Sequence, residues 1–474
     1  MDLSYNNAAL GRLIIRVTTI IKLIKKLLRK SRANHPPVDA SYIIPRTQHN
    51  VSKTDISINA LKVLNRLNSA GFQAYLVGGS VRDLLLGKAP KDFDIATNAT
   101  PNQIKKLFRN ARIIGRRFKL VHIIFHRDIV EVATFRRASE SENETVETNQ
   151  LTNERGMLVR DNVYGTLDED AWRRDFTVNS LYYNIDDSSI VDFTGGVADV
   201  QQRLLRIIGD PATRYQEDPV RMLRAVRFSA KLHFELAAET AAPLQKLAHL
   251  IKDVSGSRLF DEMTKLYQCG EGESVQRLLV EHGLFPHLFE QTANLLSGSE
   301  YPVNALLGIA LENTDARVRD NKPITPAFLF AVLLWFPLKA RAVYLQEQEG
   351  LDPLPALEKA MSEVIVEQNR VVTIPKRFSQ VMREIWLLQF RFPKRYGGRA
   401  FNLLQHPRFR AAYDFLALRA LAGDESIELA QWWTNFQDSD EKSQLAMVKA
   451  LAPQPLPQKH RKRRKSKKST IPSQ

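Results

Sequence analysis

The chain has 474 residues, of which 44% are apolar and 25% charged, and such a composition is typical of a soluble protein with two to four domains. Its single cysteine, Cys269, excludes an internal disulfide framework, and the ten scattered histidines argue against a structural zinc site. We therefore expect a reducing, cytoplasmic compartment and a small, buried hydrophobic role for Cys269.

The net charge of +16 is concentrated at the two ends of the chain. Residues 1–38 carry eight Lys/Arg and one acid, and residues 459–474 carry eight Lys/Arg and no acid. The middle of the chain is therefore nearly neutral. This distribution predicts a polyanionic partner that is held partly by the terminal segments.

Near the N-terminus, residues 10–28 place apolar side chains at spacings of three and four, with basic residues on the other faces. The pattern predicts a basic amphipathic helix. Its interleaved charges exclude an ordinary membrane span, and it lacks the features of a signal peptide. Two interpretations stay open: a helix packed on its own protein, or a contact of residues 10–30 with a partner or, peripherally, with the inner membrane.

A linker follows to about residue 51, and then a helix that begins near Asp55 with Ile58, Leu61, Leu64 and Leu67 on one face and ends at Gly71. After it, an apolar strand ends at Val77. The Gly78–Gly79 pair has no β-carbons, so the backbone can approach a polyanion closely. Residues 80–85 then have the apolar spacing of a helix, whose free N–H groups would face a phosphate.

Two acids follow this helix on an alternating segment. Asp92 and Asp94 are two residues apart, so on a strand both carboxylates project to the same face. Adjacent like charges are unfavourable unless a cation lies between them. A Gly-Gly pair alone is usually a turn and an Asp-x-Asp alone is usually a solvated strand edge. The ordered combination of the two predicts a divalent-metal site opposite a triphosphate.

Further elements of the first half of the chain follow in order. Thr100–Pro101 caps a helix over 103–108, with threonine at the cap and proline in the first turn. Strands are expected over 112–114, 120–125 and 129–135, and the Ser-, Glu-, Asn- and Thr-rich residues 138–155 read as a mobile insertion. Glu131 lies on a buried-looking strand and needs a partner. That partner is either a metal ion or one of Arg136 and Arg137.

Two charged clusters lie downstream. The first is Arg173-Arg174-Asp175-Phe176-Thr177-Val178-Asn179, which on its own could be a surface salt-bridge cluster. The second has Asp218 as a helix cap, Pro219 in the first turn, and Arg221, Arg224 and Arg227 at i+3 spacing. On periodicity alone these are helix-surface arginines. From Gly195–Gly196 onward the pattern is overwhelmingly helical to about Gly423.

The run GlyGlySerValArgAsp, followed by AspPheAsp, resembles the signature of the DNA polymerase β nucleotidyltransferase superfamily. Its form resembles the class II branch, which holds bacterial poly(A) polymerases and tRNA CCA-adding enzymes. The resemblance implies that Asp92 and Asp94 are catalytic and bind Mg²⁺ or Mn²⁺. Glu131 matches the superfamily's apolar–acid–apolar element as a third ligand. Nucleotide binding is implied for Gly78, Gly79, Ser80 and Arg82.

The downstream clusters also resemble motifs of this family. ArgArgAspPheThr implies that Asp175 is an active-site carboxylate, that Arg174 meets the nucleotide and that Asn179 holds its ribose or phosphate. GluAspxxArg implies that Asp218 and Arg221 hydrogen-bond the incoming base, with Arg224 also at the nucleotide. Whether Glu131, Asp175 or both complete the metal site stays open.

Two features resemble the poly(A) polymerases more than the CCA-adding enzymes. Residues 113–123 carry GlyArgArgPhe and a following histidine, which implies RNA contacts by Arg116 and Arg117. The basic tail resembles their arginine- and lysine-rich extension, and its RNA-binding candidates are Lys459, Arg461, Lys462, Arg463, Arg464 and Lys465. Ser80 departs from the third glycine of many poly(A) polymerases, and the N-terminal helix is not part of the family motif.

We therefore expect an α+β fold, with a small nucleotidyltransferase head built on a mixed five-stranded sheet and an all-α neck, body and RNA-binding region. The expected segments are 1–50, N-terminal helix and linker; 51–200, head; 201–270, neck; 271–456, body and RNA-binding domain; and 457–474, disordered tail.

The predicted activity is template-independent addition of AMP from ATP to RNA 3′ ends by a monomer, with RNA-decay or RNA-chaperone proteins as candidate partners. The alternatives are tRNA CCA addition and a non-catalytic basic RNA-binding protein.

Overall fold

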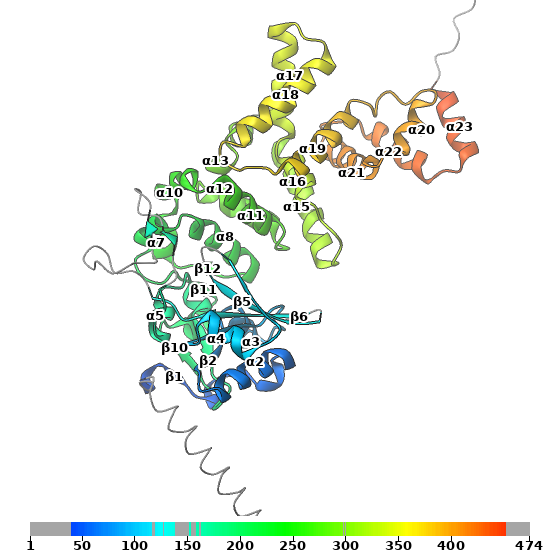
Figure 1. Cartoon of the computed structure of the whole chain (residues 1–474). Coiled ribbons are helices and arrows are strands. Elements are labelled where there is room, and N and C mark those ends of the chain that lie inside the picture. The colour runs from blue at the N-terminus through cyan, green and yellow to red at the C-terminus, as the bar shows by residue number, and fades with distance from the viewer. Residues whose placement is uncertain are drawn as a thin grey trace, which may run out of the picture. The chain divides into compact units, whose positions relative to one another are not determined.

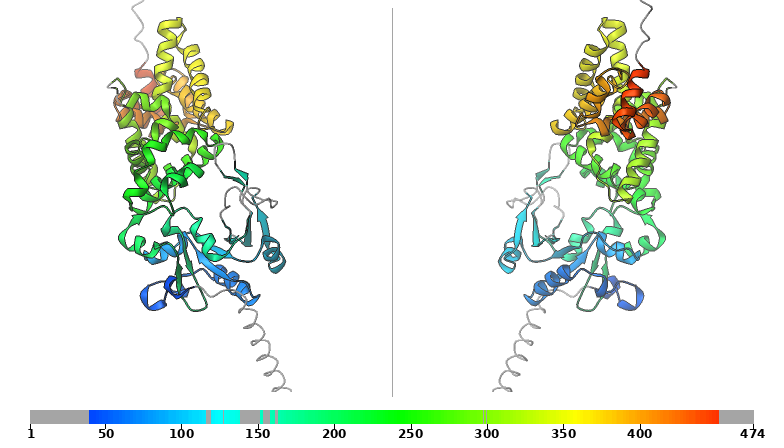
Figure 2. Two further views of the ribbon diagram at one scale, coloured as in Figure 1. Left: turned by 90° about the vertical axis from the view of Figure 1, so that its left-hand side faces the viewer. Right: turned by 90° about the vertical axis from the view of Figure 1, so that its right-hand side faces the viewer.

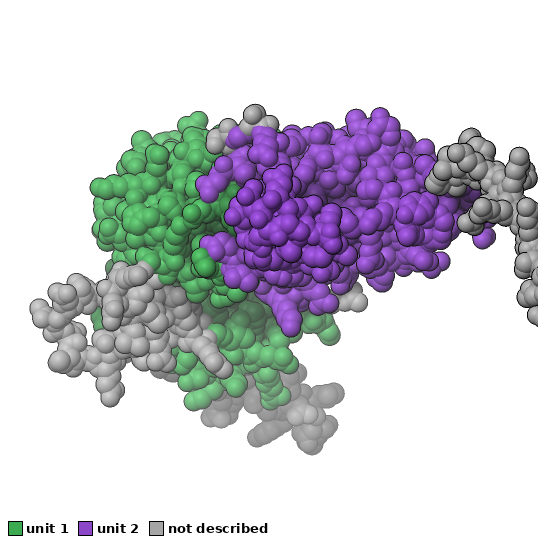
Figure 3. Space-filling model, turned by 90° about the horizontal axis from the view of Figure 1, so that it is seen from above, with its two compact units in different colours: residues 1–293, 314–323, 368–373 green, residues 294–313, 324–367, 374–474 purple. Residues whose placement is uncertain are grey.

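The computed structural model describes residues 39–451, except for 116–118, 127, 138–150, 153–157, 161–162, 297 and 299. Within this part, the chain divides into two compact units (Figure 3). Unit 1 comprises residues up to 293 together with 314–323 and 368–373, and unit 2 comprises 294–313, 324–367 and the residues from 374 onward. The predicted N-terminal helix and basic tail lie outside the described residues.

Unit 1 contains a mixed sheet with the strand order β1-β10-β9-β2-β3-β6-β5-β4, of which β1, β2, β5, β6 and β10 are labelled in Figure 1. Neighbouring strands are antiparallel, apart from the parallel pair β3–β6. The strands are β1 (Ile43–Ile44), β2 (Ala74–Val77), β3 (Asp94–Thr97), β4 (Ala111–Ile114), β5 (Leu120–Phe125), β6 (Asp128–Thr134), β9 (Leu181–Tyr183) and β10 (Ile190–Asp192).

The mixed α+β class is confirmed, but the expected strand number of five is wrong, because the sheet has eight strands. The additional strands β1, β9 and β10 have only two or three residues each. Such segments are too short to show an alternating pattern. Two further pairs lie outside this sheet: β7 (Leu151–Thr152) with β8 (Leu158–Arg160), and β11 (Leu204–Leu205) with β12 (Glu235–Leu236).

Local sequence signals place the helices of the first half of the chain. Ser57 caps α2 and Thr100 forms a capping box with Gln103 at α4, where Pro101 is the first helical residue, as predicted. Ile58, however, is 72% exposed, because the buried face of α2 runs through Ala60, Val63, Leu64 and Leu67. The helices are α2 (Ile58–Ser69), α3 (Gly79–Leu85), α4 (Pro101–Leu107), α5 (Leu167–Trp172), α6 (Gly196–Gln202), α7 (Pro211–Glu217), α8 (Val220–Leu232), α9 (Ala238–Ala241), α10 (Leu244–Leu247), α11 (Gly256–Tyr267), α12 (Gly272–Glu281) and α13 (Phe285–Leu288).

Helices continue to Ala450, well beyond the periodic region seen in the sequence. They are α14 (Glu290–Leu296), α15 (Val303–Arg319), α16 (Pro326–Leu333), α17 (Trp335–Glu349), α18 (Pro353–Gln368), α19 (Lys376–Gln389), α20 (Arg399–Leu404), α21 (Phe409–Leu421), α22 (Ile427–Asp438) and α23 (Glu441–Ala450). α17 and α18 lie side by side in both sets of views (Figures 1 and 2), joined by the ion pair Arg341–Glu363.

Two expectations concern membrane contact and the lone cysteine. Within the described residues, no helix on its own has the length and apolar content of a membrane span, and α16 with α17 meets the criteria only as a pair bent by 49°. Cys269 is half-buried rather than fully buried.

Short 3₁₀ segments complete the fold: Ala40–Tyr42, Arg46–Gln48, Lys53–Asp55, Thr177–Asn179 and Ala248–Asp253.

Candidate active site

The turn after β2 requires glycine. Gly78 has φ +75°, a conformation that residues with a side chain rarely adopt, and it precedes the first residue of α3. A β-carbon at this position would lie 3.5 Å from the carbonyl oxygen of Asn179 and 3.7 Å from Nη1 of Arg174. Ser80 is buried and its hydroxyl donates to the carbonyl of Val77 at 3.1 Å. The turn is therefore a tight, bare stretch of backbone beside an arginine.

The strand register brings the predicted acids next to this turn. Val77, the last residue of β2, pairs with Asp94, the first residue of β3. β3 is parallel to β6, with Ile95 opposite Val132, so Asp94 and Glu131 occupy corresponding positions one residue earlier. Corresponding residues of neighbouring strands project to the same face of a sheet. The structure thus gathers the glycine turn, Asp94 and Glu131 at one edge of three adjacent strands.

The electrostatics of Asp94 reflect this gathering. Its side chain remains accessible to solvent, but the surrounding protein removes enough water to disfavour the charged form. This burial, together with the charges of Glu131 and Asp92, raises the pKa of Asp94 to about 6, while Arg174 opposes the shift. Asp92 is exposed and precedes the strand. Three carboxylates therefore repel one another here.

Glu131 has a different protein partner from the one expected. Its Oε2 lies 3.2 Å from Nε2 of His122, the residue directly opposite on β5. Arg136, one of the two arginines expected beside it, donates to the carbonyl of Lys119 at 3.2 Å. The pairing follows from strand register, because cross-strand neighbours are closer than residues five or six positions along the chain.

Arg174 connects the glycine turn to a buried acid. Its guanidinium donates to Asp170 (Nη2–Oδ2 3.0 Å) and to the hydroxyl of Tyr182 (2.7 Å). Burial alone would lower the pKa of Arg174, but Tyr182 and Asp170 raise it overall, so it stays charged. Burial likewise would raise the pKa of Asp170, and Arg174 and Arg173 hold it below its usual value. The cation is therefore fixed in position.

Asp175 is held by a second arginine. Nε of Arg224 donates to Oδ2 of Asp175 at 2.7 Å, its Nη2 donates to the same oxygen, and Nδ2 of Asn179 donates to Oδ1 at 3.3 Å. Burial opposes the charged form of Asp175, yet Arg224 and these hydrogen bonds lower its pKa overall. Oδ1 of Asn179 accepts from the buried Arg82 at 2.5 Å. One continuous chain of contacts thus joins α3 to α8.

The expected base-binding pair is engaged by other residues of the protein. The carboxylate of Asp218 accepts two hydrogen bonds from Arg258, at 2.8 and 2.7 Å, and its Oδ1 also lies 3.3 Å from the backbone N–H of Val220. Arg221 donates to Glu217 at 2.7 Å and to the carbonyl of Arg214 at 2.8 Å. Both template residues are therefore held in fixed orientations.

These side chains line one pocket in unit 1, with five arginines and three carboxylates: Arg173, Arg174, Asp175, Asp218, Arg221, Arg224, Arg258 and Glu262. The excess of positive charge suits a polyanionic ligand. Gly78, Gly79, Ser80, Arg82 and Asn179 are not among the lining residues. Arg116 and Arg117, and Lys459, Arg461, Lys462, Arg463, Arg464 and Lys465, lie outside the described residues.

Sequence reasoning missed Arg258 and Glu262. Both lie on α11, about 40 residues after the motif that they contact, so no local pattern links them to it. One signal was present: Arg258 stands in the first turn of its helix, where a positive charge opposes the helix dipole. Such a placement indicates a compensating partner.

Comparisons with known proteins find three family models that match this chain. Residues 74–206 match the poly A polymerase head domain, 233–296 the probable RNA and SrmB-binding site of polymerase A, and 349–468 the polymerase A arginine-rich C-terminus. The chain is 49% identical over 424 residues to poly(A) polymerase I of Salmonella typhi, covering 89% of this chain and 91% of that protein.

Two other matches are more distant. A CCA-adding enzyme of Bacillus pumilus is 38% identical over 230 residues, which is 48% of this chain and 54% of that enzyme. A solved tRNA-processing enzyme in its apo form shares the fold, with a TM-score of 0.56 and 20% identity over 85% of this chain and 98% of that one.

Proposed function

The chain belongs to the poly(A) polymerase I family, and we propose that it adds AMP from ATP to RNA 3′ ends without a nucleic-acid template, releasing pyrophosphate. The observation that carries this proposal is the pairing of Val77 with Asp94, which sets a glycine turn without β-carbons beside an acid cluster. Nucleotidyl transfer needs those two elements next to each other, because the reacting phosphate lies between its cradle and its metal-binding acids.

The triphosphate would lie over the Gly78–Gly79 turn, whose lack of β-carbons leaves room for close approach. Arg174 supplies a fixed positive charge next to that turn, and Asp170 and Tyr182 keep its side chain in place. Because this cation is preorganised, it stabilises negative charge on the phosphates without reorganising during the reaction.

The donor chemistry of the acid cluster fits Mg²⁺ or Mn²⁺. Hard carboxylate oxygens are suitable ligands. Burial, together with the charges of Glu131 and Asp92, raises the pKa of Asp94, and a cation would favour its charged form. Among the described residues no group of three or more acids, histidines or cysteines is already arranged to hold a metal ion. When bound, the ion would activate the RNA 3′ hydroxyl and neutralise charge on the phosphates. Asp92, Asp94 and Glu131 are the proposed ligands.

Nucleotide choice is assigned to Asp218 and Arg221. A carboxylate accepts from an exocyclic amine and a guanidinium donates to ring acceptors, so the pair can read the edge of a base. Their contacts with Arg258 and Glu217 fix both groups. A rigid template of this kind favours one base over another, since a poorly matched base leaves polar groups unpaired.

RNA is the proposed second substrate, in RNA processing and decay, and the cationic tail is expected to add salt-sensitive affinity that does not depend on sequence. CCA addition is the less favoured alternative, because the match to a CCA-adding enzyme covers only 48% of the chain. A non-catalytic RNA-binding protein is disfavoured, since every acid of the signature is present.

The test supplies purified protein and Mg²⁺ with either generic RNA or tRNA lacking its terminal CCA, and with each nucleoside triphosphate separately. Long tails formed from ATP alone on both acceptors are expected. CTP incorporation that stops after a few additions on tRNA, with no tail on generic RNA, would replace this proposal with CCA addition.

A further inference from the structure

A second cationic surface lies in unit 2 and is formed by residues other than those assigned above. Residues 390–399, here called the basic loop, connect α19 to α20 and read Phe-Arg-Phe-Pro-Lys-Arg-Tyr-Gly-Gly-Arg. They contain four cations, Arg391, Lys394, Arg395 and Arg399, and no acid. Within the described part of the chain none of these four forms an ion pair, whereas Arg408 and Arg419 of the same unit do.

Three of the cations lie over aromatic rings. Nζ of Lys394 is 3.9 Å from the ring centre of Phe390, the guanidinium of Arg399 is 4.5 Å from that of Tyr396, and that of Arg395 is 5.1 Å from that of Trp432. Tyr396 is also 48% exposed. The loop thus presents aromatic and cationic groups in alternation at its surface.

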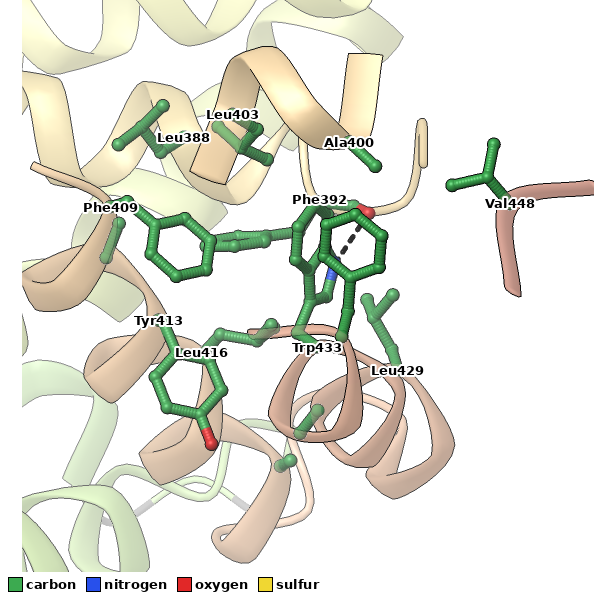
Figure 4. Close-up of a cluster of buried hydrophobic side chains, with 14 residues drawn as sticks. Leu388, Phe392, Ala400, Leu403, Phe409, Tyr413, Leu416, Leu429, Trp433 and Val448 are labelled. Carbon is green, nitrogen blue, oxygen red and sulfur yellow. Dashed lines mark hydrogen bonds between the residues drawn. The ribbon is translucent and has the colours of Figure 1, made fainter. Parts of the chain in front are cut away.

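The loop is anchored at both ends. Phe392 is fully buried in the core of the C-terminal helices, and Nε1 of Trp433 donates to its carbonyl at 3.1 Å (Figure 4). Ala400, immediately after the loop, is buried in the same core. The backbone between these two anchors is therefore held, so the exposed side chains can bind a ligand at a low cost in ordering.

Apart from these ring contacts, hydrogen bonds to the backbone do not account for the four cations. Basic residues after a helix often donate to its last carbonyls. Among the described residues, however, the side chains of Arg391, Lys394 and Arg395 donate to none, and Arg399 donates only to the hydroxyl of Tyr396. Nη1 of Arg395 is buried with no hydrogen-bond partner, and its neighbour positions Gly397 and Gly398 face open space.

We propose that the basic loop binds single-stranded RNA, with a base stacked on Tyr396 and the adjoining phosphates held by Lys394 and Arg399. Aromatic rings interleaved with cations are what such a strand requires, because bases stack while phosphates attract charge. A lipid surface would attract the same cations, but it has no flat base to stack on the exposed ring of Tyr396. The inference rests on the proposed function, since it assigns part of the RNA substrate to this surface, separately from the cationic tail.

The proposed phosphate contacts of Lys394 and Arg399 are tested by measuring the equilibrium binding of the full-length protein to a short oligoadenylate, without nucleotide or metal. Each phosphate contact on a single strand contributes about 0.7 to the slope of log affinity against log salt. Lys394→Ala/Arg399→Ala should therefore reduce that slope by about 1.4. The matched control, Lys442→Ala/Lys449→Ala, removes the same charge from exposed positions on α23 of the same unit and should leave the slope near that of the unmodified chain.

A second pair of variants tests stacking. Tyr396→Ala should weaken oligoadenylate binding on the order of tenfold without changing the salt slope, and Tyr396→Phe should retain wild-type affinity. The proposal is overturned if Tyr396→Ala binds like Tyr396→Phe, or if the loop and control double variants share one salt slope. Loss of binding to anionic vesicles with unchanged RNA binding would assign the loop to a membrane and also overturn it.

The two proposals fail in different ways. If the wild-type chain binds oligoadenylate through the loop but adds no AMP, the proposed function fails while the loop assignment stands. If it adds AMP and all loop variants bind RNA normally, only the loop assignment fails.

Discussion

Arg258 donates two parallel hydrogen bonds to the carboxylate of Asp218, Nη1–Oδ1 at 2.8 Å and Nη2–Oδ2 at 2.7 Å. The two residues come from different helical segments, since Asp218 lies between α7 and α8 and Arg258 lies in the first turn of α11. A bidentate guanidinium–carboxylate pair fixes orientation as well as distance. The acid proposed to read the base is thus set in place by a residue outside the motifs described in the sequence analysis.

Arg258→Ala should reduce discrimination between ATP and CTP by about tenfold, because Asp218 loses two charge-assisted hydrogen bonds and becomes free to rotate. The measurement is kcat/KM for each nucleotide on the same RNA. Arg277→Ala, which removes an exposed arginine paired with Glu281, serves as the control and should leave the ratio unchanged. An equal loss for both nucleotides would show that the pair supports folding rather than choice.

Asp94→Asn should stabilise the metal-free protein at neutral pH. The pKa of Asp94 is raised to about 6 from 3.8, so ionising this side chain destabilises the folded protein. The destabilisation develops as pH rises from 3.8 to about 6 and is complete above that value. Asparagine cannot ionise, so the variant avoids this destabilisation, which solvent screening keeps small. In the presence of a chelator at neutral pH, the melting temperature of Asp94→Asn should therefore be about 2 °C above that of the wild-type protein. Below about pH 4 the two proteins should melt together. A lower melting temperature for the variant at neutral pH would contradict the repulsion described.

Glu131, rather than Asp175, should complete the metal site. Glu131 contributes directly to the raised pKa of Asp94, whereas Asp175 is occupied by Arg224. Adding Mg²⁺ should raise the melting temperature of the wild-type protein, because a ligand that binds only the folded state stabilises it. That rise should disappear in Glu131→Gln and persist in Asp175→Asn. The opposite pattern would place Asp175 at the metal.

Asp175→Asn should instead lower stability at neutral pH by about 3 kcal/mol, because it leaves the cation of Arg224 without its partner. The pKa of Asp175 is lower in the folded protein than its value of 3.8 in the unfolded chain. The stabilisation from its charged form is therefore fully present above pH 3.8 and is lost as pH falls through the pKa of the folded state. Denaturant titration at neutral and acidic pH should therefore show a difference that narrows in acid. As a control, Glu281→Gln breaks an exposed ion pair and should change the free energy of unfolding by less than about 1 kcal/mol. An equal effect from both variants would contradict the claim that the buried Asp175–Arg224 pair stabilises the fold more than an exposed pair does.

Local chemistry explains which elements could be predicted from the sequence. The Gly78–Gly79 turn, α3 and the Asp92–Asp94 segment are encoded within twenty residues by glycine, alternation and helical spacing. The structure forms the turn, α3 and a strand there, but β3 begins only at Asp94, so Asp92 precedes the strand on which it was expected. The His122–Glu131 contact and the Arg258–Asp218 pair depend instead on strand register and helix packing across the chain. A single sequence carries no direct signal for such contacts, apart from the unfavourable position of Arg258 in its helix.

The most direct measurement of the central claim is the product length from a single RNA, with ATP as the only nucleotide and Mg²⁺ present, for the wild-type protein and Asp94→Asn. RNA affinity is measured in parallel. We predict long tails from the wild-type protein and none from Asp94→Asn, with RNA affinity equal in both. Tails from Asp94→Asn as long as those of the wild-type protein would contradict the assignment of the reaction to this acid cluster.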